Sequence, residues 1–263
     1  MKHCLLILVA ACLACAGCFE NHSRPADVMT VTSLRELAAT NRGEVVRLFL
    51  RGSKEPITDA ALEGLSETGL QQLDLSECGL KAVPETAWRL KGLTSFWFVR
   101  NKLAVIPDEI AQFPALTYLN LDGNSITNIP DSLAGATKLR WLHLDANMIG
   151  ELPASLAALK DMRRIYLRVN KFTSVPEVVK EWPELEDLVL DDNAITEVPD
   201  WVGTDLSKNL KTLSLKGCPI KRLPDDLSGL RNLSRLDLAD CPLPSEEVDR
   251  IRKVLGDKVV ILF

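Results

Sequence analysis

Few side chains beyond residue 29 have the types and spacing that catalysis requires. His143 is the only histidine of this stretch, which excludes metal sites and acid–base pairs built from two histidines. No glycine-rich phosphate loop follows a predicted strand, and neither a GxSxG nor an HExxH motif is present. Asp122 and Asp145 lie 23 residues apart and could hold a hard cation, or they could be solvated or neutralised by Arg168. We therefore predict a protein that is not an enzyme and that needs no metal and no cofactor.

Aromatic and basic side chains form the more informative set. Both tyrosines of the chain, two of its five tryptophans and its central histidine fall between residues 97 and 166. Trp, Tyr and Arg are the residue types that dominate the binding energy of protein interfaces. The predicted partner-binding residues are Trp97, Tyr118, Trp141, His143, Tyr166, Arg140, Arg164 and Arg168. Whether they share one surface depends on the elements that carry them.

These residues lie within a sequence that repeats itself. Apolar residues open successive units, most of which are 23 residues long. The units from Val45 and Leu185 are 25 residues long. The nine units open at Val45, Leu70, Leu93, Leu116, Leu139, Met162, Leu185, Leu210 and Leu233. A period of this size is typical of a solenoid, in which each unit stacks on the one before it.

Each unit predicts one short strand followed by a bend and a convex segment. The opening LxxLxL block alternates at period two, so its leucines point into a core and the residues between them point outward. Asn recurs at position 9 in five consecutive units, where its amide can satisfy backbone groups of the bend. Pro recurs at position 15 in seven units and disfavours a regular helix there. We expect positions 18 and 21 to complete the core, and Trp88 and Trp201 to cover it in part.

The units carry the pattern LxxLxLxxNxIxxIP over residues 45–243 and resemble those of the leucine-rich-repeat superfamily. The resemblance implies an α/β solenoid. This would be a right-handed horseshoe with a parallel sheet on its concave face and short helical or extended segments on its convex face. It also implies that the concave face binds a protein or peptide, without naming that partner.

The phase of the repeat directs the aromatic side chains away from the core. Trp97, His143 and Tyr166 occupy position 5 of their units, and Tyr118 and Trp141 occupy position 3. They share four consecutive strands, a span of roughly 15 Å. In one interpretation the rings only pack against one another and stabilise the sheet. We favour a second, in which they anchor a partner, although both can hold at once.

Other hypotheses for this surface stay open. The basic side chains could be paired internally instead of meeting a partner. Such pairs would join Arg163, Arg164 and Arg168 to Glu186, Asp187 and Asp191 of the next unit. The aromatic rings could stack on sugars of an envelope glycan, or the surface could be structural or self-associating. A formal net charge of −5, or −6 without Lys2, argues against a nucleic-acid partner.

The ends of a solenoid need caps, because a terminal unit cannot cover its own core. Residues 30–44 are predicted to form an N-terminal capping helix, which Ser33 and Glu36 open as a capping box. Residues 244–263 are predicted to form a C-terminal cap, a helix from Ser245 to a stop at Gly256 and then a last strand.

The first 17 residues have the pattern of an export signal. Lys2 and His3 precede an apolar run that is too short to span a bilayer. The following Cys18 resembles the acylated cysteine of a bacterial lipobox, and residues 18–29 read as a tether. The resemblance implies a lipoprotein of the cell envelope, sorted to the outer membrane if the cell has one. Cleavage by ordinary signal peptidase after Ala16 is the alternative, and it predicts a secreted or periplasmic protein.

Three cysteines lie beyond the signal, and each stands at position 9 of its unit. Cys78, Cys218 and Cys241 therefore replace the inward asparagine, which predicts buried, reduced thiols. Cys218 and Cys241 fall in adjacent units, so a disulfide between them is the alternative. The two extra residues near 203–205 are expected to lengthen a convex loop.

Overall fold

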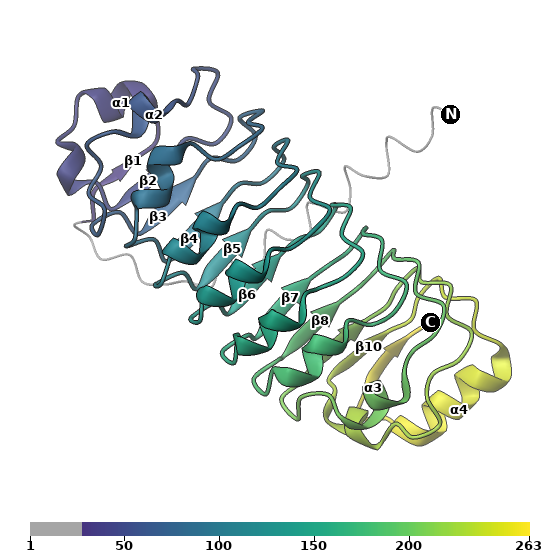
Figure 1. Ribbon diagram of the computed structural model, residues 1–263. Coiled ribbons are helices and arrows are strands. Elements are labelled where there is room, and N and C mark those ends of the chain that lie inside the picture. The colour runs from purple at the N-terminus through teal and green to yellow at the C-terminus, as the bar shows by residue number, and fades with distance from the viewer. Residues whose placement is uncertain (1–27) are drawn as a thin grey trace, which may run out of the picture.

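A computed structural model describes residues 28–263 as a curved stack of units whose concave wall is one sheet (Figure 1). Eleven parallel strands follow one another in chain order, so each strand pairs with the strands of the preceding and following units. The strands are β1 (Thr30–Val31), β2 (Arg47–Phe49), β3 (Gln72–Asp74), β4 (Ser95–Trp97), β5 (Tyr118–Asn120), β6 (Trp141–His143), β7 (Arg164–Tyr166), β8 (Asp187–Val189), β9 (Thr212–Ser214), β10 (Arg235–Asp237) and β11 (Val260–Leu262). The α/β solenoid with a parallel concave sheet is confirmed. The predicted signal peptide, Cys18 and most of the tether lie outside the described residues.

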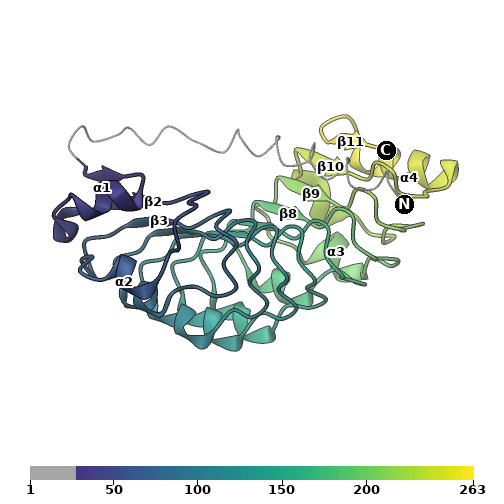
Figure 2. The same ribbon diagram turned by 90° about the horizontal axis from the view of Figure 1, so that it is seen from above.

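The helices are α1 (Leu34–Ala38), η2 (Arg42–Glu44), α2 (Asp59–Leu62), η3 (Glu85–Arg89), η4 (Asp108–Gln112), η5 (Asp131–Gly135), η6 (Ala154–Ala158), η7 (Glu177–Glu181), α3 (Asp200–Thr204), η8 (Ser228–Asn232) and α4 (Ser245–Leu255). The helices from α2 to η8 line the convex side of the arc, and α1 and α4 lie at its two ends (Figure 2). Five of the repeated prolines, from Pro84 to Pro176, immediately precede 3-10 helices. Proline fixes φ and lacks an N–H, so it suits the start of a helix and not its interior. The prediction of short helical turns is confirmed.

The two 25-residue units differ from the others on the convex side. Each of them carries an α-helix, α2 or α3, where most 23-residue units carry a 3-10 helix. Neither α-helix is longer than the five-residue 3-10 helices of the other units. The segment between α3 and β9, residues 205–211, is instead longer than the corresponding segment 90–94 between η3 and β4. The expectation that the two extra residues near 203–205 lengthen a convex loop therefore agrees with the structure.

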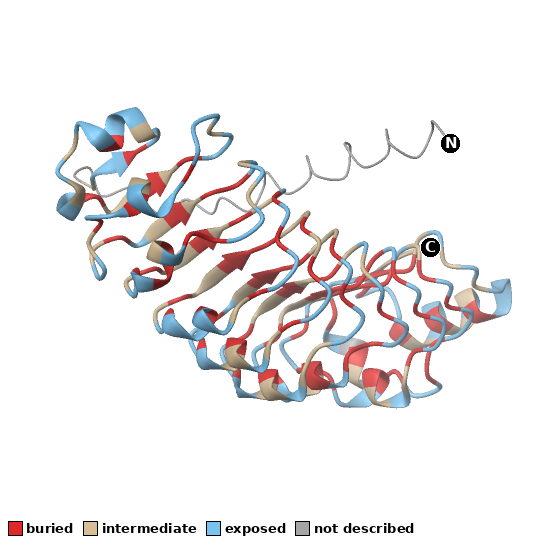
Figure 3. Ribbon diagram, turned by 45° about the horizontal axis from the view of Figure 1, so that its top comes forward, coloured by how far each residue is buried: buried red, intermediate tan, exposed pale blue. Residues whose placement is uncertain are grey.

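The core runs without a break along the solenoid. Leucines of the strands and the residues at positions 18 and 21 are buried, as Figure 3 shows by the red segments inside the arc. Trp182 is fully buried, and its indole N–H donates to the Leu156 carbonyl at 2.8 Å. Trp88 is buried and stacks on Phe113, with ring centroids 5.3 Å apart, while Trp201 packs against the core in part. The two convex tryptophans therefore cover the core, as predicted.

The asparagines at position 9 form a second continuous feature, here called the asparagine ladder. Its members are Asn101, Asn124, Asn147, Asn170 and Asn193. In Asn147, Oδ1 accepts from the N–H of Ile126 at 3.0 Å, and Nδ2 donates to the carbonyls of Leu121 and Leu144, each at 3.1 Å. Every such side chain joins its own unit to the preceding one. Because these backbone groups have no strand partner, the ladder satisfies them inside the solenoid.

The residue at position 8 of every unit adopts a left-handed backbone conformation. Its φ lies between 51° and 69° in all nine units, although only Gly52, Gly123 and Gly217 are glycines. Val169 is the least suited of the others, because a β-branched side chain is strained at its φ of 52°. Glycine spacing alone could not have revealed this repeated bend.

Both caps form, with one difference from the expectation. Helix α1 starts as predicted: the Ser33 hydroxyl accepts from the N–H of Glu36. The Glu36 carboxylate accepts from the N–H of Thr32, not from that of Ser33. The N-terminal cap is more than a helix, because β1 precedes α1 and extends the sheet by one strand. At the other end α4 stops before Gly256, whose φ is 68°, and β11 pairs with β10. Among the described residues, no helix combines the length and the apolar character needed to cross a bilayer.

Candidate functional site

The sheet register brings the predicted aromatic residues together on the concave face. Trp97, Asn120, His143 and Tyr166 are paired neighbours across β4 to β7. Tyr118 and Trp141 are paired in the next row. Because the intervening leucines point into the core, these two rows face away from it. The aromatic residues of these strands therefore share one outward surface of the sheet.

The rings contact one another in a continuous line, here called the aromatic strip. It comprises Phe49, Trp97, Tyr118, Trp141, His143 and Tyr166. Ring centroids are 6.2 Å apart for Phe49 and Trp97, and 5.1 Å for Trp97 and Tyr118. His143 stacks on Tyr166 at 4.3 Å. Cross-strand ring packing is therefore present, and it includes Phe49, which we had not assigned to the site.

The members of the strip differ in how much they can offer a partner. Trp97, Tyr118, Trp141 and Tyr166 are half-buried, so part of each ring remains accessible. His143 is only 5% exposed, because the neighbouring rings cover it. Burial, with help from the positive charges of Arg168 and Arg164, lowers the pKa of His143 to about 4. His143 is thus a neutral spacer between Tyr118 and Tyr166 and offers little contact surface of its own.

Arginines border the strip where the strands begin. Arg140, Arg163 and Arg164 form this arginine edge, and all three have an acidic partner. Nitrogen–oxygen distances are 3.8 Å from Arg140 to Asp161, 3.4 Å from Arg163 to Glu186 and 3.1 Å from Arg164 to Asp187. The alternative of internal pairing with the next unit is therefore correct for Arg163 and Arg164. A ligand would meet arginines whose charge is already largely balanced.

Carboxylates border the strip where the strands end. Asp122, Asp145 and Asp191 form this acid edge, and Arg168 lies between the last two. Its Nη1 is 3.3 Å from Asp145 Oδ2, and its Nε is 3.1 Å from Asp191 Oδ2. The same guanidinium lies 5.4 Å from the centre of the Tyr166 ring. Arg168 thus pairs with Asp191 of the next unit and with Asp145, so the alternative that it neutralises Asp122 and Asp145 holds for Asp145.

Asp122 occupies the end of the acid edge that is far from Arg168. Its Oδ1 accepts from the N–H of Asp145 at 2.7 Å, and its Oδ2 lies 3.8 Å from His143 Nδ1. Burial and the negative charge of Asp145 raise the pKa of Asp122 to about 8. Burial also raises the pKa of Asp145, to about 6, against the opposing effect of Arg168. Burial thus favours the protonated form of both Asp122 and Asp145.

The other groups considered for chemistry are in structural positions. Within residues 28–263, no group of three or more histidine, cysteine or acidic side chains is arranged to hold a metal ion. Cys78, Cys218 and Cys241 are free, so the disulfide alternative is wrong in this structure. Burial raises the pKa of Cys218 and of Cys241 to about 11. Their thiols donate to Leu190 and Leu215 carbonyls at 3.3 and 3.2 Å, and so take over a ladder hydrogen bond.

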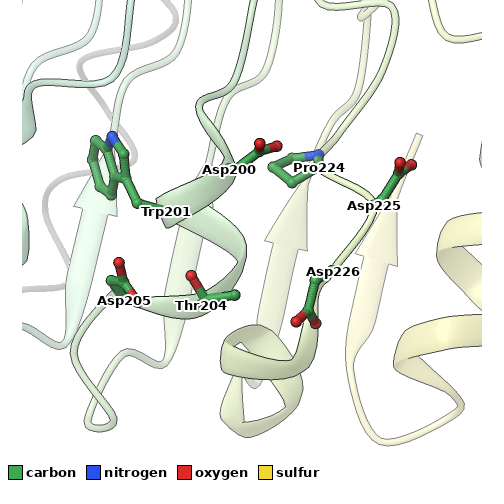
Figure 4. Close-up of a pocket in the computed structure, with 7 residues that line it drawn as sticks. All are labelled: Asp200, Trp201, Thr204, Asp205, Pro224, Asp225 and Asp226. Carbon is green, nitrogen blue, oxygen red and sulfur yellow. The ribbon is translucent and has the colours of Figure 1, made fainter.

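A hollow of about 430 Å³ on the convex side is a feature that the sequence did not point to (Figure 4). Its lining comprises Asp200, Trp201, Thr204, Asp205, Pro224, Asp225 and Asp226. All four carboxylates are exposed, so water screens their charge and competes for any cation. The concave face, with its rings and half-buried charges, is the stronger candidate for a functional surface.

Comparisons with known proteins agree with this architecture. The family model for the leucine rich repeat matches residues 68–126, 93–149 and 183–243, which together make up more than half of the chain. None of the curated proteins compared with the sequence matches it.

Several solved structures share the fold. An internalin, InlF from Listeria monocytogenes, superposes with a TM-score of 0.71 at 23% identity, over 89% of this chain and 64% of the internalin chain. The ectodomain of the receptor kinase GASSHO1/SCHENGEN3 from Arabidopsis thaliana, solved with CASPARIAN STRIP INTEGRITY FACTOR 2, gives 0.65 at 25% identity, over 84% and 27%. The plant peptide hormone receptor RGFR1, solved with RGF2, gives 0.64 at 23%, over 82% and 35%. This chain spans less than two thirds of each of them.

Proposed function

Because this chain belongs to the leucine-rich-repeat family, we propose that it is a non-enzymatic module that binds a protein or peptide on its concave face. The observation that carries the proposal is the aromatic strip, a line of rings across β2 to β7 of which all but that of His143 are half-buried. Two plant receptors with a similar fold were solved in complex with a peptide hormone or another factor, which supports this class of ligand.

The packing of the rings in the strip favours the binding of a partner. Rings that already pack on one another lose little conformational freedom when a partner arrives, so the entropic cost of binding is small. The hydrogen-bonded parallel sheet beneath them fixes their spacing. Tryptophan and tyrosine also combine a large apolar surface with a polar group, which is why they dominate interface energies.

The test removes ring surface without touching the core. A Trp97→Ala/Trp141→Ala double variant should weaken partner binding by about 2 kcal/mol or more and keep its circular dichroism spectrum. Trp201→Ala is the matched control, because Trp201 is also half-buried but lies on the convex side. Crosslinking pull-downs with all three proteins, followed by titration of the captured partner, provide the measurement. Equal capture by the double variant would refute the concave strip as the binding surface.

The same experiment separates the other ligand classes. A glycan array probed with the unaltered protein would reveal sugar binding, whose loss in the double variant would assign the strip to glycans. The rings of Trp97 and Tyr118 are inclined by 39° and those of Tyr118 and Trp141 by 48°, so they form no flat platform for a chain of sugars. A concentration-dependent mass in light scattering would instead indicate self-association.

We further propose that the module is anchored at the bacterial envelope through an acylated Cys18. This rests on the apolar run that precedes Cys18 and on the polar stretch that follows it. Metabolic labelling with palmitate should mark the unaltered protein in a bacterial host, and Cys18→Ala should abolish both the label and membrane association. An unlabelled mature protein beginning at Gly17 would support the ordinary signal peptidase instead.

A further inference from the structure

We propose that the partner presents a basic side chain, lysine or arginine, which lies against the aromatic strip and pairs with Asp122. This inference rests on the proposed function and names the chemistry of its ligand. The abundance of arginine on this face would suggest an acidic ligand, whereas we propose a basic one. Some charges of the concave face are already balanced by a partner and others are not.

The arginine edge is a poor receptor for an acidic partner. Arg163 and Arg164 are held by Glu186 and Asp187 at 3.4 and 3.1 Å, and Lys211 adds a second cation to Glu186 at 2.9 Å. An incoming carboxylate would have to compete with these pairs and with the negative charge of their acids. The net gain of such an exchange is small.

The acid edge is balanced at one end only. Arg168 supplies one guanidinium to two carboxylates, those of Asp145 and Asp191. In the described part of the chain, the ion-pair contact of Asp122 is with His143, at 3.8 Å. Because His143 is neutral at physiological pH, that contact brings no positive charge. Among the three carboxylates of the acid edge, Asp122 is therefore the one where an added cation gains most.

The aromatic strip reaches Asp122 directly. The imidazole that faces its carboxylate belongs to the strip and lies 5.2 Å from the Tyr118 ring. Tyr118 in turn lies 5.1 Å from Trp97. A lysine or arginine that approaches Asp122 from the concave side therefore passes over these rings. Its apolar stem would pack on the rings while its charged group pairs with the carboxylate.

The surroundings of Asp122 make this binding depend on pH. The titratable and charged groups that face it are His143 and Asp145 from the β6 unit and Arg168 from the β7 unit. On the β4 side, Arg100 turns its guanidinium to Glu77, at 3.5 Å. The raised pKa of Asp122, about 8, means that a cation must displace a proton below that pH. Affinity should thus rise with pH and level off above about 8.

The experiment selects ligands from random sequences, so the natural partner need not be identified first. A displayed library of short peptides is selected on the purified protein, and retained sequences are counted only if Trp97→Ala/Trp141→Ala abolishes their binding. These peptides should be enriched in lysine or arginine. One such peptide is then synthesised with its basic residue, and again with norleucine, which lacks the charged group. Affinities are measured for the unaltered protein, Asp122→Asn and Asp192→Asn.

Asp122→Asn keeps Oδ1 as acceptor for the Asp145 N–H, so the loop stays closed. We expect it to weaken the basic peptide about tenfold or more, as norleucine does in the unaltered protein. The two losses should not add, since each removes the same pair. Asp192 is an exposed acid three strands away, at the same end of the strands. The control variant Asp192→Asn should therefore leave the affinity unchanged. The rise of affinity toward pH 8 should disappear in Asp122→Asn.

The other outcomes are decisive in different ways. Strip-dependent peptides without a preference for lysine or arginine would overturn the inference and leave the proposed function standing. Additive losses from norleucine and Asp122→Asn would also overturn it, because they would place the cation elsewhere. If no retained peptide depends on Trp97 and Trp141, the proposed function fails and the inference fails with it.

Discussion

The buried interior of the solenoid and the aromatic strip on its concave face use the repeat in opposite ways. In the interior one residue type recurs at one position, and the ladder asparagines repeat the same hydrogen bonds from unit to unit. In the strip the repeat fixes only the position, and the residues differ from strand to strand. The same residue type recurs in the interior because each unit offers it the same backbone surroundings. The strip residues differ from unit to unit, so their types are not set by the repeat and can serve the recognition of a partner.

The largest expected effect compares one residue type in the two regions. Trp182→Ala should lower the free energy of unfolding by about 4 kcal/mol, because the indole is fully buried and bonded to the Leu156 carbonyl. Trp97→Ala should lower it by only about 1 kcal/mol, since its ring is half-buried. Urea unfolding followed by circular dichroism measures both. Equal losses would mean that the strip is as structural as the core.

The asparagine ladder should come next. Asn147→Ala removes one acceptor and one amide donor from a site that is 8% exposed. It leaves the N–H of Ile126 without its acceptor, while the carbonyls of Leu121 and Leu144 keep the donors Asn124 and Asn170. We expect a loss of about 3 kcal/mol in urea unfolding. Asn128→Ala, at an exposed convex position, is the control and should change little. A small effect at Asn147 would show that water enters the bend and replaces the amide.

The acid edge should make stability depend on pH. The folded protein holds the Asp122 proton more tightly than the unfolded chain, because the pKa rises from 3.8 to about 8. Its contribution is therefore complete below pH 3.8 and declines as the pH rises to about 8. Asp122→Asn should exceed the unaltered protein in stability at pH 9, by on the order of 2 kcal/mol, and match it at low pH. Asp108→Asn, an exposed change on η4, should show no such difference.

The smallest effect concerns the bend beside the strip. Val169→Asn should stabilise the protein by about 1 kcal/mol, because Asn tolerates the left-handed conformation that strains a β-branched residue. Val169 is 42% exposed, so little packing is lost. Val105→Asn, a more exposed valine without a positive φ, serves as the control in the same thermal and urea unfolding curves. A destabilised Val169→Asn would mean that this valine packs more tightly than its exposure indicates.

Most of the fold could be predicted because its determinants are local and periodic. The spacing of Leu116, Leu119 and Leu121 placed a strand and its buried face. Pro130 disfavoured a regular helix at its position, and a short 3-10 helix follows it. Burial of Asn124 followed from its recurrence at the strand end. The left-handed bend at Val169 could not be predicted in this way, because its residue type varies while its backbone is imposed by the neighbouring units.

The outward direction of Trp97, Tyr118, Trp141 and Tyr166 was likewise determined by the sequence alone, through the two-residue period of a strand. Only the tertiary structure decided what surrounds them. In it, Arg168 pairs with Asp145 and Asp191, the rings of Tyr118 and Tyr166 cover His143, and Asp122 lies beside a neutral imidazole. These outcomes depend on side-chain rotamers and on which neighbour, 23 residues before or after, a charge approaches. A periodic pattern predicts the position of each side chain. It does not predict which neighbouring charge that side chain pairs with, because this depends on burial and distance in three dimensions.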